Sequence, residues 1–161
     1  MSRGKEVKEL REKMRMNRRE FSDYYGIPYR TIQDWEAGEF YQIEDCNRMI
    51  YIGSDLPDEY MHSNYTRILK GANAKAKANA TQGIPMLLQC ATNRRWQENY
   101  KGKHNVDAKY GWYRFTTRFA LPVYDSNTGE LERFNIFRIE MLIRHAADGN
   151  LYLYDMVNIK K

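Results

Sequence analysis

The stretch that decides the fold of the N-terminal third is residues 17–38, NRREFSDYYGIPYRTIQDWEAG. Asn17 is followed three residues later by Glu20, a capping-box pattern that predicts the start of a helix. Gly26 tolerates the positive φ at which such a helix ends, and Pro28 sets φ for the entry of the next helix. We therefore predict two short helices joined by a tight turn, the second beginning directly after Pro28.

Amphipathic segments flank this pair of helices. Val7, Leu10 and Met14 recur three and four residues apart among charged neighbours, which predicts a preceding helix. The apolar residues of segment 43–52 fall on one side of a helix, so we predict a fourth helix that closes a small all-α core. Gly38 is expected to end the third helix.

The spacing of small and apolar residues within the quoted stretch is specific. Ser22 is followed four residues later by Gly26 and six residues after that by Ile32, and the stretch closes with Trp35-Glu36-x-Gly38. In this pattern the chain resembles, over about residues 5–52, the helix-turn-helix domains of the Cro and phage-repressor family. The resemblance implies a compact bundle of four or five helices whose third helix enters the major groove of double-stranded DNA.

The resemblance also implies which side chains read base edges. In the family's pattern these side chains point outward from the start of the third helix, and here they are Tyr29, Arg30, Gln33 and Asp34. Arg30 suits the O6 and N7 atoms of guanine, and Gln33 can pair with N6 and N7 of adenine. Tyr29 would bond a phosphate or touch a thymine methyl group, and Asp34 would accept from cytosine N4 or orient Arg30.

Phosphate contacts are expected around the N-terminus of the second helix, which attracts anions. The candidates are Asn17 and Arg18, with Arg15 and Arg19 as weaker ones. Arg11 and Glu36 match family positions that form a structural ion pair, and a bidentate guanidinium–carboxylate bond would suit them. Phe21, Ile27, Ile32 and Trp35 are expected to fill the core.

The second half of the chain changes its period. A helix is expected to begin at Thr81 and to end near residue 100. Apolar and polar residues then alternate in segments 112–121 and 137–144, on either side of a turn signal at residues 125–129, which predicts two paired strands. A second hairpin turn at Asp148-Gly149 leads into residues 151–159, the third predicted strand.

We therefore predict an α+β protein with an N-terminal all-α helix-turn-helix bundle (residues 1–53) and a C-terminal αβββ domain (residues 81–161). Residues 54–80 are expected to form a basic linker that is partly helical. A three-stranded antiparallel sheet needs a helix on its apolar face to be stable. The predicted cover is Met86, Leu87, Cys90 and Trp96.

The positive charge of the chain lies late in the sequence. The formal net charge is +5, and residues 71–161 carry 14 Lys and Arg against eight Asp and Glu. The densest part, residues 67–103, would attract a polyanion. We predict a second surface for nucleic acid or a partner there and on the polar face of the sheet. Its candidates are Lys75, Lys77, Arg94, Arg95, Arg114, Arg118, Arg138 and Arg144.

Several classes of protein are disfavoured by the composition. No run of roughly 18 apolar residues exists to span a bilayer, so we expect no membrane partner and a cytoplasmic location. Cys46 and Cys90 lack the spacing of metal ligands. We therefore expect no metal and no cofactor.

The C-terminal segment offers a weaker resemblance. Its Tyr110-Gly111-Trp112-Tyr113 stretch, its Asp148-Gly149 turn and residues 153–161 loosely resemble small αβββ domains of phage and mobile-element proteins. Some of these are related to the barnase, EndoU, colicin and RelE nuclease fold. A ribonuclease of that type would need an acid or base beside phosphate-binding cations. His104, before the first strand, is the candidate for that role, whereas His62 and His145 are expected to be structural or surface residues.

Three functions follow from these patterns as expectations. The leading one is a non-enzymatic, sequence-specific DNA-binding regulator of phage or mobile-element origin, acting as a homodimer. Its C-terminal domain would serve dimerisation or bind a protein or ribonucleoprotein partner. The alternatives are an inhibitor of a host defence complex, on the plan of some anti-CRISPR proteins, and a nuclease or toxin-like ribonuclease.

Overall fold

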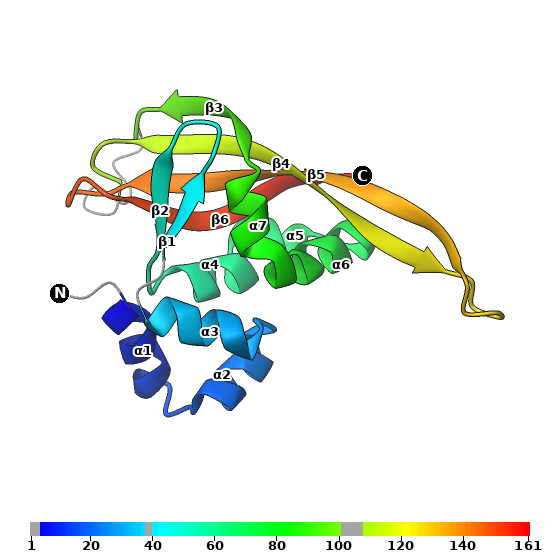
Figure 1. The fold of residues 1–161 in the computed structure, drawn as a ribbon. Coiled ribbons are helices and arrows are strands. Elements are labelled where there is room, and N and C mark those ends of the chain that lie inside the picture. Colours follow the sequence, from blue (N-terminus) through cyan, green and yellow to red (C-terminus); the bar gives the residue numbers. More distant parts are fainter. Residues whose placement is uncertain (1–3, 38–39, 101–107) are drawn as a thin grey trace.

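The computed structural model of the chain describes residues 4–37, 40–100 and 108–161, and over these ranges the protein is α+β (Figure 1). Helices lie along one side of a six-stranded mixed sheet whose strand order is β1-β2-β6-β5-β4-β3. The predicted α+β class is confirmed in this coarse sense. The sheet is larger than predicted, and it includes strands from the N-terminal third.

The first three predicted helices are present and pack together: α1 (Gly4–Lys13), α2 (Arg18–Tyr25) and α3 (Tyr29–Glu36). Asn17 caps α2, and both bonds of the capping box with Glu20 are present. Gly26 ends α2 with φ of 66°, in the left-handed region where a side chain would be strained. The local signals in this stretch were therefore sufficient to predict it.

The core of this bundle contains the expected side chains. Phe21, Ile27, Ile32 and Trp35 are all buried, as is Val7 of α1. Leu10 and Met14 are partly buried against the same core, which confirms the stripe along α1. Gly38, predicted to end the third helix, lies outside the described residues.

The predicted fourth helix over residues 43–52 is wrong. This segment belongs to a β-hairpin of β1 (Phe40–Ile43) and β2 (Arg48–Ile52), with Asn47 at φ of 53° in the connection. β2 pairs in parallel with the last strand of the chain. β-branched residues such as Ile50 and Ile52 favour strands. The periodicity of this short apolar segment also fits a helix, so the long-range pairing with β6 determines that it forms a strand. The N-terminal unit is therefore not all-α.

Residues 54–80, predicted to be a partly helical linker, form packed helices. They are α4 (Leu56–His62), α5 (Asn64–Ile68) and α6 (Gly71–Ala80), followed by a 3-10 turn (Thr81–Gly83) and α7 (Ile84–Gln89). α4 and α6 pack against β6, and α7 packs against β1 and β4. This segment is helical in larger part than predicted, and it contributes buried residues to the common core.

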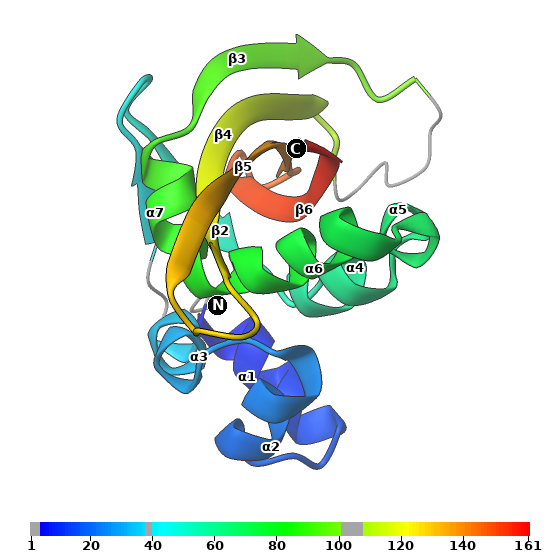
Figure 2. The same cartoon turned by 90° about the vertical axis from the view of Figure 1, so that its right-hand side faces the viewer.

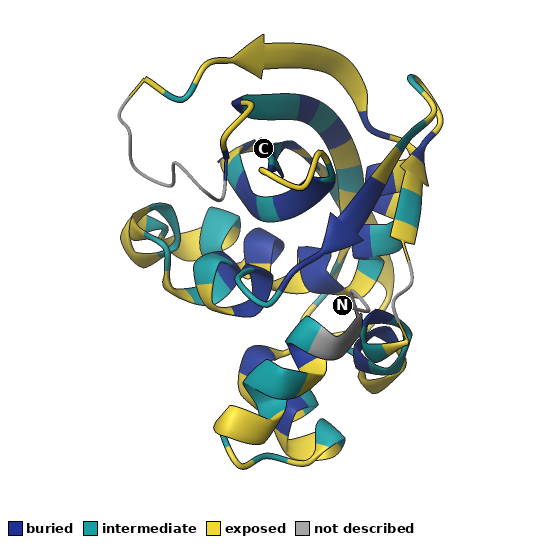
Figure 3. Cartoon of the chain, turned by 90° about the vertical axis from the view of Figure 1, so that its left-hand side faces the viewer, coloured by how far each residue is buried: buried dark blue, intermediate teal, exposed yellow. Residues whose placement is uncertain are grey.

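The three predicted strands are present as β4 (Trp112–Tyr124), β5 (Leu131–His145) and β6 (Leu151–Lys160), paired as an antiparallel meander. The helix expected to run from Thr81 to about residue 100 ends at Gln89. Residues 92–97 form instead the edge strand β3 (Thr92–Gln97) beside β4. β3 is exposed along its length (Figure 3).

Only part of the predicted cover of the sheet is correct. Leu87 is buried, with Ile84 and Leu88 beside it on α7, whereas Met86, Cys90 and Trp96 are exposed. Trp96 lies on β3 and donates its indole N–H to the Tyr110 carbonyl. The helical period therefore failed after Gln89, where the chain becomes a strand.

The two faces of the sheet differ in character. On the helix side, β4 and β5 bury alternate residues such as Phe115, Phe137 and Ile139. The opposite face carries the polar positions that alternate with them. Beyond the helices, β4 and β5 continue as a two-stranded arm, residues 120–136, which projects away from the rest of the molecule (Figures 1 and 2).

Candidate nucleic-acid interface

Helix α3 has a buried side and an exposed side. Thr31, Ile32 and Trp35 face the bundle and are buried. The four predicted base readers, Tyr29, Arg30, Gln33 and Asp34, lie on the other side and are exposed or half-buried. The Arg30 side chain is 84% exposed, and its Nε lies 3.2 Å from Asp34 Oδ1. α3 thus presents donors and acceptors to solvent from a helix that its buried side holds in place.

The contact between Arg30 and Asp34 orients the guanidinium without fixing it. An exposed pair four residues apart on a helix contributes about 0.3–0.5 kcal/mol, so a guanine edge that accepts two hydrogen bonds would compete with it effectively.

The predicted phosphate contacts divide into two groups. Arg15 and Arg19 are exposed, and the Arg19 guanidinium lies 5.7 Å from the centre of the Tyr29 ring. The Asn17 side-chain oxygen is engaged in capping α2, accepting from the Glu20 N–H at 2.8 Å. Arg18 makes an ion pair within the protein, a role that the sequence analysis did not assign to it.

The ion pair between Arg11 and Glu36 is present and is larger than predicted. Glu36 Oε1 lies 2.5 Å from Arg11 Nε, and its Oε2 lies 2.6 Å from Arg18 Nε. The carboxylate is 3% exposed. Burial alone would raise its pKa, but the hydrogen bonds and charges of the two arginines outweigh burial and hold the pKa of Glu36 below its usual value. One carboxylate therefore ties α1, α2 and α3 together behind the exposed face of α3.

The candidate cations of the second surface differ in their exposure and in their ion-pair partners. Arg144 pairs with Asp55 at 2.8 Å and lies over the Tyr152 ring. Arg95 and Arg114 both bind Glu140, at 3.0 and 3.2 Å. The candidates that are exposed and make no ion pair with a described residue are Lys75, Arg94, Arg118 and Arg138.

Lys77 is not a surface residue, which corrects the prediction. It is 2% exposed, and its Nζ donates to Asp155 at 2.7 Å and to Thr66 Oγ1 at 2.5 Å. The rings of Tyr60 and Tyr65 lie 4.8 and 5.2 Å away. The sequence could not show this, because the partner carboxylate lies 78 positions later in the chain.

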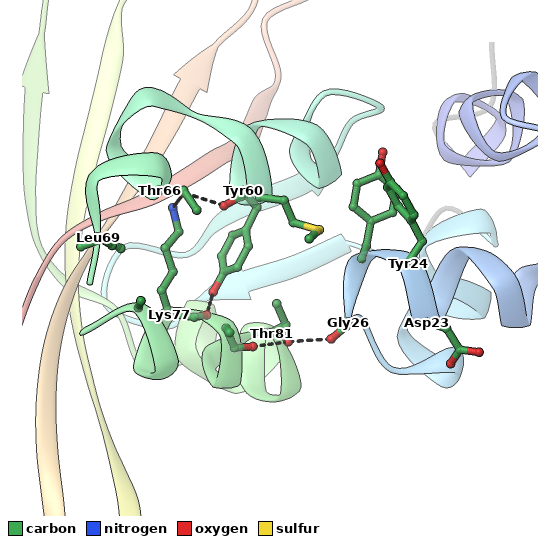
Figure 4. Close-up of a pocket in the computed structure, with 12 residues that line it drawn as sticks. Asp23, Tyr24, Gly26, Tyr60, Thr66, Leu69, Lys77 and Thr81 are labelled. Carbon is green, nitrogen blue, oxygen red and sulfur yellow. Dashed lines mark hydrogen bonds between the residues drawn. The ribbon is translucent and has the colours of Figure 1, made fainter. Parts of the chain in front are cut away.

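The bundle of α1, α2 and α3 meets the rest of the protein beside this ion pair (Figure 4). Thr81 donates to the Gly26 carbonyl at 2.9 Å, and the Tyr25 hydroxyl donates to Asp58 at 2.5 Å. A cavity of about 370 Å³ lies between them, lined by α2 on one side and by α4, α5 and α6 on the other. These polar contacts around a cavity thus join the bundle to the rest of the protein, in addition to the apolar core that the two parts share.

Two of the three histidines fall within the described residues. His104 lies outside the described residues, as does the end of the basic segment 67–103. His62 is exposed at the end of α4. His145 Nε2 lies 3.2 Å from the Gly149 carbonyl, and its ring lies near those of Tyr110 and Tyr113.

Comparisons of the chain with protein-family models, with curated proteins and with solved structures found no match. Among the helices of the described ranges, none is long and apolar enough to cross a membrane.

Proposed function

We propose that the protein is a sequence-specific DNA-binding regulator that inserts α3 into the major groove. One observation carries this proposal: α3 is anchored by Ile32 and Trp35 on its buried side and presents Arg30 and Gln33 on its exposed side. An α-helix fits the major groove, where each base pair offers a distinct set of donors and acceptors.

The rigidity of the bundle supports a reading role. The capping box fixes the start of α2, Gly26 fixes the turn, and Glu36 holds the three helices together. A reader whose support is rigid loses little conformational entropy on binding. Each well-placed bidentate contact contributes about 1–3 kcal/mol of discrimination against the wrong base, so Arg30 and Gln33 would together supply much of the sequence preference.

Charge alone would bind this module weakly to DNA. Residues 4–37 carry eight Lys and Arg and seven Asp and Glu, so the module is close to neutral. Arg15 and Arg19 are the exposed arginines near α2 that would contact phosphates. We therefore expect binding as a dimer, in which two linked modules gain effective concentration.

The arm of β4 and β5 supports a dimerisation role for the C-terminal half. Its outward face, continuing the polar face of the sheet, carries Phe134 and Ile136 exposed to solvent. Exposed apolar clusters of this kind mark protein interaction sites. The variant Phe134→Ser/Ile136→Ser should shift a dimer to monomer in sedimentation experiments, and an unchanged sedimentation coefficient would exclude the arm as the dimer contact.

The DNA-binding proposal is tested by selection of bound duplexes from a random library, followed by titration of the selected site. Arg30→Ala/Gln33→Ala should lose the sequence preference and weaken binding by about 2–6 kcal/mol in total. Lys8→Ala is the matched control, because Lys8 is an exposed cation on α1, where its only ion pair in the described chain is a weak contact with Glu12. If the wild type selects no common sequence, or if the double variant selects the same one, the proposal fails.

A further inference from the structure

Three cations lie side by side on the polar face of the sheet. Arg118 on β4 is the direct register partner of Arg138 on β5, and Arg138 is the direct register partner of Lys160 on β6. Directly paired residues place their side chains on the same face, with Cα atoms about 4.5–5.5 Å apart. All three residues are exposed. We call these three residues the cation row.

The cation row is not compensated by the protein within the described ranges. Neither arginine nor the lysine has a carboxylate partner there. Along the same two strands, two residues away, the opposite situation holds: Glu140 accepts from Arg95, Arg114 and Asn158. Like charges directly opposite one another destabilise a sheet. The cation row is therefore destabilising, whereas the charges around Glu140 compensate one another.

A cavity lies beside the two arginines. It encloses about 580 Å³ and is lined by Arg118 and Arg138 together with polar residues of β3 and β4, namely Thr92, Asn93, Thr116 and Thr117. β3 leaves its regular register with β4 here, between Thr92 and Arg95, and Asn93 takes a φ of 59°. The cavity therefore combines two guanidinium groups with hydroxyl and amide groups that can also donate.

We propose that the cation row and this cavity bind a phosphate group, at a site separate from α3. Guanidinium forks match the oxygens of phosphate in a bidentate manner. A phosphate lying between Arg118 and Arg138 would replace the repulsion across the strands with two charge-assisted contacts. Lys160 adds a third charge from β6, and the hydroxyl of Thr92 or Thr116 would serve an oxygen that the arginines do not reach.

Two sources can supply this phosphate: the backbone of a nucleic-acid strand or a phosphorylated small molecule. Both would make the same contacts with the cation row, so the second experiment below distinguishes them.

The first test compares thermal unfolding in chloride and in inorganic phosphate at equal ionic strength. Phosphate should raise the melting temperature of the wild type, because a ligand that binds only the folded state stabilises it. Arg118→Gln/Arg138→Gln should lose this response. In chloride alone, the same variant should melt no lower than the wild type, since the substitutions remove repulsion rather than a contact.

The second test separates the two sources by fluorescence anisotropy with a labelled single strand of eight nucleotides and the matching duplex. If the source is a nucleic-acid backbone, the double variant should bind roughly 10- to 100-fold more weakly, and the dependence of binding on salt should become shallower. If the double variant loses the stabilisation by free phosphate but binds both oligonucleotides as the wild type does, the source is a phosphorylated small molecule.

The matched control is Arg133→Gln, an exposed arginine on the opposite face of the same hairpin, paired with Glu132. It should respond to phosphate and to oligonucleotides as the wild type does. Arg30→Ala/Gln33→Ala should also keep the phosphate response, which distinguishes this site from the reading face of α3. The proposal is overturned if the wild type responds to neither ligand, or if the response survives loss of both Arg118 and Arg138.

Discussion

Replacing Lys77 by methionine tests whether the buried ion pair supports the junction of the two halves. Methionine keeps the volume and removes the charge, leaving Asp155 without the cation that lies 2.7 Å away. Burial lowers the pKa of Lys77, against the attraction of Asp155. Burial likewise raises the pKa of Asp155, although Lys77 favours its ionised form. Each charge therefore offsets part of the cost of burying the other.

The magnitude follows from what remains after the substitution. Removing one partner of a buried ion pair leaves an uncompensated charge and costs about 3–5 kcal/mol. For a chain of this size, about 2–4 °C of melting temperature correspond to each kcal/mol, so Lys77→Met should melt about 6–20 °C lower. Lys77→Met/Asp155→Asn should recover part of this loss. The asparagine oxygen can still accept from the Met156 N–H, which Asp155 Oδ1 binds at 2.7 Å.

The assay is urea denaturation of four proteins: the wild type, Lys77→Met, the double variant with Asp155→Asn, and Lys75→Met. Lys75 is exposed two residues earlier on α6, and its substitution should change the unfolding free energy by no more than about 0.5 kcal/mol. The reasoning is refuted if Lys77→Met and Lys75→Met have equal effects. It is also refuted if the double variant is no more stable than the single variant, because the two charges would then not be coupled.

Three further predictions concern the bundle of α1, α2 and α3. Glu36→Gln should lower stability at neutral pH and flatten the stability profile at low pH, measured by urea denaturation from pH 7 to pH 3. The lowered pKa of Glu36 means that its stabilisation is present above about 4.5 and is lost as the pH falls through the folded-state pKa. Gly26→Ala should cost about 1–2 kcal/mol in the same assay, because the left-handed backbone strains a side chain although a Cβ would meet no neighbour. Thr81→Val should cost about 1 kcal/mol and speed amide hydrogen exchange in α2, because it removes the hydrogen bond to the Gly26 carbonyl; unchanged exchange would contradict a role in docking the bundle.

Local signals in the sequence were enough to predict two parts of the fold. The α2-turn-α3 unit depends on the capping box at Asn17 and on Gly26, both of which act within a few residues. The meander of β4, β5 and β6 follows from the alternation in β4 and β5 and from the turn signals between the strands. In both parts the decisive interactions join residues that are close in the sequence, so the pattern carries the information.

Segments whose partners are distant could not be predicted in the same way. The strand β2 forms because Ile50, Tyr51 and Ile52 pair with Leu151, Tyr152 and Leu153, about 100 residues later. Its apolar residues fit a helix as well as a strand, and only the pairing decides. β3 is a similar case, since an edge strand that is exposed along its length has no alternating pattern to reveal it.

The same limit applies to the candidate site. Composition predicted a basic second half, but it could not show which cations the protein neutralises itself. Lys77 and Arg144 are neutralised by Asp155 and Asp55, which come from distant elements. Arg118 and Arg138 remain free of such partners within the described chain. The structure thus reduces the eight candidate cations to those that are exposed and make no ion pair with a described residue. Among these, Arg118 and Arg138 are the two that line a cavity.

The parallel pairing of β2 with β6 joins the two candidate binding surfaces through one sheet. The hairpin that follows α3 in the chain belongs to the same sheet as the cation row, and β6 contributes both Leu153, which pairs with β2, and Lys160 of that row. A ligand bound at either surface stabilises the folded state by an amount set by its concentration and affinity. Because one sheet joins the surfaces, unfolding that separates β2 from β6 removes support from both. If DNA binds α3 and phosphate binds the cation row, as proposed, each ligand would therefore also protect the pairing of β2 with β6.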